Sequence, residues 1–180
     1  MFACQSLSSI VVYNFYTWDK PKDWDFKKHS GFIRSISWLE DDTGFASCGY
    51  DEIVCLWKLN PDVSEDEKKN NPNWQLMYEG PYGDSNKTDF THVSVTKSDS
   101  DKFPIIYACG ADNVIREIEA VEKENSQPVL KAKVKYEEHV QLSKLAFTQN
   151  RKFFFAGKVE KDLPGSIQVL KYPFKKCFEI

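Results

Sequence analysis

The sequence repeats one short pattern of apolar and polar segments, and this repetition limits the possible folds more than any other feature. Three segments, residues 33–38, 90–95 and 142–147, each place apolar side chains at positions i, i+3 and i+5. Each is followed by a polar turn, by a short apolar run that ends in small residues and glycine, and by a further apolar run. Gly49, Gly110 and Gly157 are interpreted as the same point in the three copies. Copies of three or four short strands separated by turns predict repeated antiparallel sheets.

The spacing of the copies predicts the kind of repeat. It is close to the roughly 40–45 residues of a propeller blade, in which one four-stranded antiparallel sheet packs face to face with its neighbours. A single blade has two apolar faces and needs a neighbour on each side to bury both. The predicted fold class is therefore all-β, with almost no helix: a β-propeller fragment of three to four blades that forms part of a larger propeller.

The repeat also predicts a division of the chain. We expect a partial blade at 1–28, a blade at 29–83 with a polar loop insert at 60–73, a degenerate blade at 84–138, and a complete or incomplete blade at 139–180. Residues 2–4 line up with 45–47, so the chain begins inside a repeat. This suggests a fragment of a longer protein or an incomplete gene model. An isolated fragment would expose strand edges, which predicts poor solubility.

Composition excludes several functional classes. Aromatic residues make up 14% of the 180 residues, which favours packed sheets. The net charge of −3 argues against general binding to nucleic acid or to an anionic membrane. The five cysteines are far apart and form no CxxC pair, so neither a disulfide framework nor a zinc site is indicated. No apolar stretch is long enough to span a bilayer, and no secretory signal is present, which favours a reducing cytosolic compartment.

The best-preserved copy, residues 29–59, contains four polar or aromatic residues of interest: His29, Ser47, Asp51 and Trp57. A serine, a histidine and an aspartate could form a hydrolytic triad, which needs a serine that is free to attack and an oxyanion hole beside it. Their order and spacing instead resemble the WD40 repeat. The resemblance implies a structural tetrad, in which the aspartate bonds the histidine, the histidine bonds the serine and the serine bonds the tryptophan indole. It implies no catalytic residues, no metal and no cofactor.

The other copies lack most of this set. The second keeps an aspartate and the third keeps a histidine, and the remaining positions carry apolar residues: Asp112, with Ala108 and Ile118, and His139, with Phe155 and Leu170. An insert at 158–165 removes the aspartate from the third copy. Replacing a whole polar network by apolar groups can be nearly neutral for stability. Catalytic groups could not be exchanged so freely, which favours the structural interpretation.

Three further groups of residues receive structural interpretations. His92 is expected at an exposed position of a strand, since no metal-ligating partner stands at suitable spacing. Glycine and aspartate in the "EGPYGD" segment are expected in turns, at Gly80, Gly83 and Asp84. An aromatic set allows two interpretations: Trp18, Trp24 and Phe26. It could form a binding face, but we expect it in the last strand of the first blade and its connection, where it would cover a sheet edge.

Three phrases give a finer resemblance: "SCG-x-D" before Trp57, "ACGADNVIREI" without a tryptophan, and "I-x-x-LKYP" near the end. Together they resemble the cilia- and flagella-associated protein 57 family of axonemal WD-repeat proteins. The resemblance implies a non-enzymatic scaffold of the axoneme, in the cytoplasm, cytoskeleton and cilium or flagellum. Its implied partners are other axonemal proteins, namely the doublet microtubule and inner dynein arm or regulatory components, with no nucleic acid or membrane. The alternative is a cytosolic WD40 adaptor of another assembly, such as a ubiquitin ligase or trafficking complex.

Overall fold

The computed structural model describes residues 2–13, 15–19, 25–59, 74–80, 87–96, 104–123, 126–137, 141–148, 152–159 and 164–180. Strands dominate these segments, and none of them contains a helix. The predicted all-β class is therefore confirmed. The polar insert 60–73, Trp24, Gly83, Asp84 and His139 lie outside the described residues.

Within the described segments, fifteen strands form four antiparallel sheets. The first sheet contains β1 (Phe2–Ser6), β2 (Ser9–Tyr13) and β3 (Asp25–Phe26). The second contains β4 (Ile33–Trp38), β5 (Gly44–Gly49), β6 (Val54–Leu59) and β7 (Trp74–Gly80). The third contains β8 (Phe90–Thr96), β9 (Ile105–Gly110), β10 (Val114–Lys123) and β11 (Ser126–Glu137). The fourth contains β12 (Gln141–Phe147), β13 (Phe153–Val159), β14 (Ser166–Lys171) and β15 (Lys175–Glu179).

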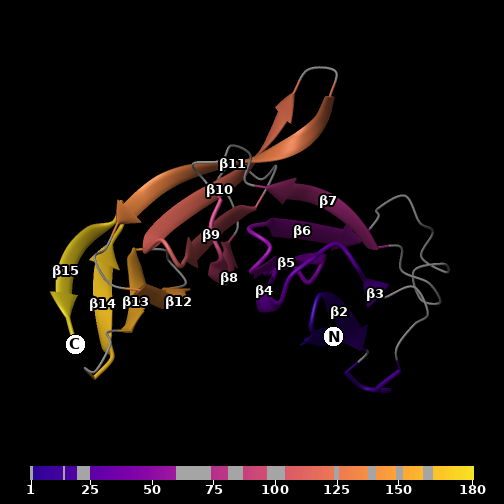
Figure 1. Cartoon of the computed structure of the whole chain (residues 1–180), viewed down its shortest axis with the longest axis horizontal. Helices are drawn as coiled ribbons and strands as arrows, with labels where there is room; N and C mark the ends of the chain where they lie inside the picture. Colours follow the sequence, from indigo (N-terminus) through magenta and orange to yellow (C-terminus); the bar gives the residue numbers. More distant parts are fainter. Residues whose placement is uncertain are drawn as a thin grey trace.

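The four sheets follow one another along an open arc (Figure 1). Each is an up-and-down ladder in chain order, because short turns join antiparallel neighbours. The first strands of the last three sheets, β4, β8 and β12, lie on the inner side of the arc, where β8 contacts both others. The sheets fall within the predicted divisions of the chain, whose exact boundaries stay a prediction.

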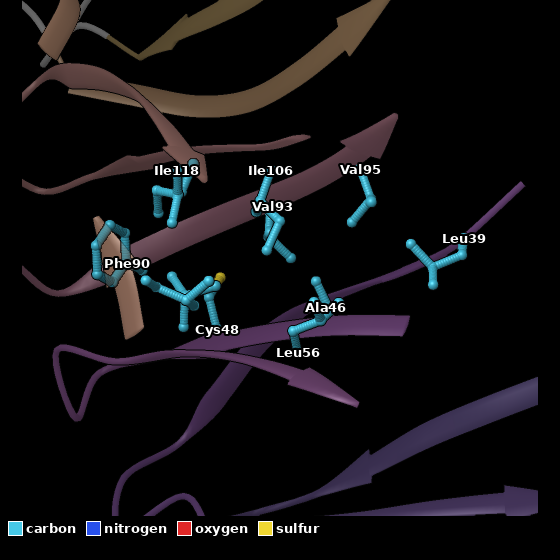
Figure 2. Packing of buried hydrophobic residues seen from close by; sticks show 12 residues of the cluster. Leu39, Ala46, Cys48, Leu56, Phe90, Val93, Val95, Ile106 and Ile118 are labelled. Atoms are coloured by element: carbon cyan, nitrogen blue, oxygen red, sulfur yellow. The ribbon is translucent and has the colours of Figure 1, made fainter. Parts of the chain in front are cut away.

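Apolar side chains are buried between successive sheets. Strand β5 is buried at every position because both of its faces are covered. Phe45 points toward the first sheet, whereas Ala46 and Cys48 point toward the third. Figure 2 shows the cluster between the second and third sheets. A further cluster joins the third and fourth sheets around Tyr107 and Phe154.

The far face of the fourth sheet has no covering sheet in the described residues. Ile167 and Phe178 are exposed there. The ladder equivalent of Ile167 in the third sheet is Ile115, which the fourth sheet buries completely. This exposed face fits the expectation of poor solubility for an isolated fragment, which stays a prediction.

Two turn and edge predictions need correction. Gly80 lies in strand β7, paired with Val54, and not in a turn. A Cβ atom there would come within 2.7 Å of the Leu130 Cβ atom, so glycine allows the close approach of the third sheet. Phe26 lies in the last strand of the first sheet as predicted, but its ring is buried in the core. Trp18 lies in an exposed turn instead of covering a sheet edge.

Candidate functional site

The four residues singled out in 29–59 meet between the first and second sheets. His29 lies in the segment that leads into β4, Ser47 in β5, Asp51 in the β5–β6 turn and Trp57 in β6. Alternation along β5 and β6 places Ser47 and Trp57 on the face that packs against the first sheet. The structure therefore brings together residues that are up to 28 positions apart.

The side chains form one continuous chain of hydrogen bonds. His29 Nδ1 lies 2.8 Å from Asp51 Oδ2, and His29 Nε2 lies 2.8 Å from Ser47 Oγ. Trp57 Nε1–H donates to the same Ser47 Oγ at 3.0 Å. These contacts assign the proton of His29 to Nδ1, which donates to the carboxylate, while Ser47 donates to Nε2. The Ser47 hydroxyl thus donates one hydrogen bond and accepts another.

Backbone groups hold Asp51 against the histidine. The Ser30 N–H donates to Asp51 Oδ2 at 2.9 Å. A Cβ atom on Gly31 would come within 2.9 Å of the Asp51 nitrogen, so the two segments could not approach this closely with a larger residue. Burial raises the pKa of Asp51, but hydrogen bonds from His29, Ser30 and Gly31 outweigh it, so the pKa lies below its ordinary value. The carboxylate therefore stays charged and orients the imidazole.

The serine, histidine and aspartate have the connectivity of a hydrolytic triad, but the serine has no access to a substrate. Ser47 is completely buried. The indole of Trp57 occupies its oxygen from one side and packs against the Phe26 and Phe45 rings. A nucleophilic serine needs an open face and oxyanion donors beside it. In this arrangement the hydroxyl connects two strands instead.

Burial also makes two thiols of the second and third sheets, those of Cys48 and Cys109, poor nucleophiles. Burial raises the pKa of Cys48 well above its ordinary value and that of Cys109 to about 11. Cys55 is buried as well, and Cys48 and Cys109 form no disulfide. Among the described residues, no group of His, Cys, Asp and Glu could hold a metal ion. The described residues also contain no helix that is long and apolar enough to cross a membrane.

The third sheet carries a different polar pair at the same place. Ala108 and Ile118 occupy the ladder positions of Ser47 and Trp57, as the sequence alignment predicts. Asp112 lies in the turn, and it accepts hydrogen bonds from the Arg116 guanidinium, with Nη1 at 3.0 Å from Oδ1. The Arg116 side chain is buried and lies over the Phe90 ring.

The fourth sheet corrects the alignment by one residue. Ala156, not Phe155, takes the ladder position of Ser47, and Lys158 takes that of the glycine. The prediction that Gly157 marks the same point as Gly49 and Gly110 is therefore wrong. All three first strands carry the same bulge, so the shift arises in β13, where the glycine comes one ladder position earlier. Leu170 takes the tryptophan position, as predicted.

His92 is half-buried, so its predicted exposed position is wrong. It lies in β8 and connects the inner strands of three sheets. Its Nδ1 lies 2.9 Å from Ser35 Oγ in β4, and its Nε2 lies 2.9 Å from the Leu145 carbonyl oxygen in β12. Burial and the charge of Lys144 lower the pKa of His92 to about 4, so the ring is neutral. Strand parity indicates one face of a sheet but not the neighbouring inner strands beside it, which is why the sequence missed this contact.

Comparisons with known proteins support this architecture. The family model "WD domain, G-beta repeat" matches residues 22–58, which include all four residues of the network. The crystal structure of the β-propeller domain of Cps50 (Swd1) from Myceliophteria thermophila is similar over 99% of this chain and 50% of that chain. The TM-score is 0.68 and the sequence identity 12%, so this likeness shows the fold alone.

Two curated relatives come from Tetrahymena thermophila. The chain is 28% identical over 189 residues to cilia- and flagella-associated protein 57 A, which covers 96% of this chain and 14% of that protein. It is 32% identical over 167 residues to cilia- and flagella-associated protein 57 C, which covers 91% of this chain and 12% of that protein. The chain thus spans less than a sixth of the length of these relatives.

Proposed function

This chain is a fragment of a WD40 β-propeller, and from that premise we propose that it is part of a scaffold of the ciliary or flagellar axoneme. In this role it is bound to doublet microtubules and helps to position or regulate inner dynein arms. The observation that supports the proposal is the similarity to two cilia- and flagella-associated proteins over more than nine tenths of the chain. The stacked sheets fit a scaffold, because they present several rigid turns for contacts with other proteins.

We propose that the four-residue network of His29, Ser47, Asp51 and Trp57 is structural and that the chain is not an enzyme. Burial of Ser47 and its use by two partners support this role. A fluorophosphonate probe applied to the native protein tests it, and no labelling of Ser47 is expected. Labelling at Ser47 that is lost in Ser47→Ala would reject the structural role.

The axonemal proposal is tested in a ciliated cell that expresses the complete gene product with a fluorescent tag. We expect the protein along the axoneme, retained with doublet microtubules after detergent extraction. Removal of the gene should slow or disorganise beating, and reintroduction should restore it. A protein confined to the cytosol, with normal beating after gene removal, would reject the proposal.

A further inference from the structure

Three apolar side chains are exposed on adjoining turns close to His29 and Asp51 of the four-residue network. They are Leu7 in the β1–β2 turn, Phe32 just before β4, and Tyr50 in the β5–β6 turn, exposed by 69%, 57% and 43%. Isolated exposed apolar residues are common, but a group on adjoining turns indicates an interaction surface.

The backbone holds these turns together. The Ile33 N–H donates to the Leu7 carbonyl oxygen at 3.0 Å, which joins the first sheet to the second. The Tyr50 N–H donates to the Phe32 carbonyl oxygen at 2.9 Å. A Cβ atom on Gly49 would come within 2.5 Å of that oxygen, so glycine permits the contact. The surface is therefore ordered before any partner binds, which lowers the entropic cost of binding.

A positively charged side chain lies against the apolar group. The Arg34 guanidinium lies over the Tyr50 ring, with 5.0 Å from its carbon to the ring centroid. Lys27, Lys28 and Arg34 are the exposed charged residues of segment 27–34, although the whole chain has a net charge of −3. Glu52 is exposed in the same β5–β6 turn as Tyr50, so one acidic residue lies among these positive charges. The local excess of positive charge favours an acidic partner.

The third sheet shows that the fold does not require this surface. Its equivalent turns make the same backbone bond, from the Ala111 N–H to the Asp89 carbonyl oxygen at 2.9 Å. There the positions of Phe32 and Tyr50 are held by Asp89 and Ala111, and that of Arg34 by Thr91. The same backbone thus presents an apolar and cationic surface on one sheet, and a small and acidic one on the next.

We propose that Leu7, Phe32, Arg34 and Tyr50 form a docking surface for an acidic peptide segment of a partner protein. Apolar side chains of that segment contact Leu7, Phe32 and Tyr50, and its carboxylates pair with Arg34, whose planar guanidinium suits them. The proposal rests on the scaffold function and names the class of partner. It does not depend on the ciliary location.

The test measures binding of the complete gene product to a fluorescent glutamate-rich peptide that carries one phenylalanine and one leucine. We expect saturable binding that weakens as salt rises. Arg34→Glu and Phe32→Ala should each weaken it about tenfold or more. Two matched controls, Lys175→Glu and Tyr16→Ala, change an exposed charge and an exposed aromatic ring elsewhere and should leave it within about twofold. All four positions are exposed, so folding is retained, which thermal melting checks.

Two control peptides complete the test, one with lysine in place of glutamate and one with serine in place of both apolar residues. Neither should bind measurably. Absent binding of the acidic peptide, equal binding of either control peptide, or equal weakening by the control variants would overturn the docking surface. If the acidic peptide does not bind but the protein is located on the axoneme, the docking surface alone is rejected. Retained binding in a protein that stays in the cytosol rejects the axonemal scaffold alone.

Discussion

The second and third sheets hold an aspartate at the same turn with different partner residues. Each has an aspartate in the turn between its second and third strands, Asp51 in one and Asp112 in the other. Asp51 bonds a histidine from a distant segment and, through it, a chain of further side chains. Asp112 bonds Arg116, which is only four residues away. The turn aspartate can therefore persist when its partner changes completely.

The two solutions differ in how fully polar atoms are satisfied. In the second sheet the shared Ser47 oxygen serves both His29 and Trp57. In the third sheet the Arg116 Nε atom is buried without a hydrogen-bond partner among the described residues. A long-range network thus joins strands and satisfies its members, whereas the local pair leaves part of a buried charge uncompensated.

The largest difference should follow removal of the tryptophan. Trp57→Ala should cost about 4 kcal/mol in the second sheet, because it opens a cavity and leaves Ser47 without its donor. The equivalent Ile118→Ala should cost about 3 kcal/mol in the third sheet. Amide hydrogen exchange at β5 and β9 measures the two losses separately. Equal loss of protection in both strands after Trp57→Ala would contradict this local role.

The local pair should behave as a pair and not as a network. Asp112→Ala should cost about 3 kcal/mol, because it leaves the buried Arg116 guanidinium without its carboxylate. Arg116→Met should be near neutral, since an apolar side chain suits this buried position. The double variant should recover most of the loss, as read from exchange at β9. Additive losses in the double variant would reject the coupling.

Much of the fold was predictable because it depends on local alternation. Apolar positions at i, i+3 and i+5 mark the first strand of each of the last three sheets, and they begin at Ile33, Phe90 and Leu142, which are equivalent in the ladders. The four network residues stand at fixed distances along the chain, so their composition and order were readable too.

The rest was not predictable, because it depends on contacts between sheets. The shift that puts Ala156 in place of Phe155 comes from the ladder register, which no single strand reveals. The environment of His92 depends on Ser35 and Leu145, which lie more than fifty residues away in opposite directions. The Arg116–Asp112 pair had a local signal, an i, i+4 pair of opposite charge, but strand geometry gave no reason to expect it.

A smaller effect should follow loss of the Ser47 hydroxyl. Ser47→Ala should cost about 2 kcal/mol, because His29 and Trp57 each keep a buried polar atom that loses its partner. Ser30→Ala is the matched control, since its backbone N–H still donates to Asp51. The free energies of unfolding of the two variants are compared by chemical denaturation, with amide hydrogen exchange in β5 as the local measurement. Equal stability of the two variants would show that the network contributes little to the second sheet.

Acid titration should separate the two sheets by the pH at which each loses stability. The pKa of folded His92 is about 4 and its ordinary value is 6.5, so the unfolded chain binds more protons between these values. Stability at β8 should therefore fall, by about 2.5 kcal/mol, as the pH drops from about 6.5 to about 4. The lowered pKa of Asp51 acts at a different pH, because its contribution is present above the ordinary value of 3.8 and is lost below it.

Exchange at β8 and β5 as a function of pH resolves these two ranges. His92→Gln should remove the pH dependence of stability only in the upper range. An amide keeps a donor for the Leu145 carbonyl oxygen but does not titrate. Asp51→Asn should flatten only the lower one, at the cost of weaker bonds to His29. If one substitution flattened both ranges, the second and third sheets would titrate as a single unit. The inner-strand contact of His92 would then couple them more strongly than the polar groups within each sheet distinguish them.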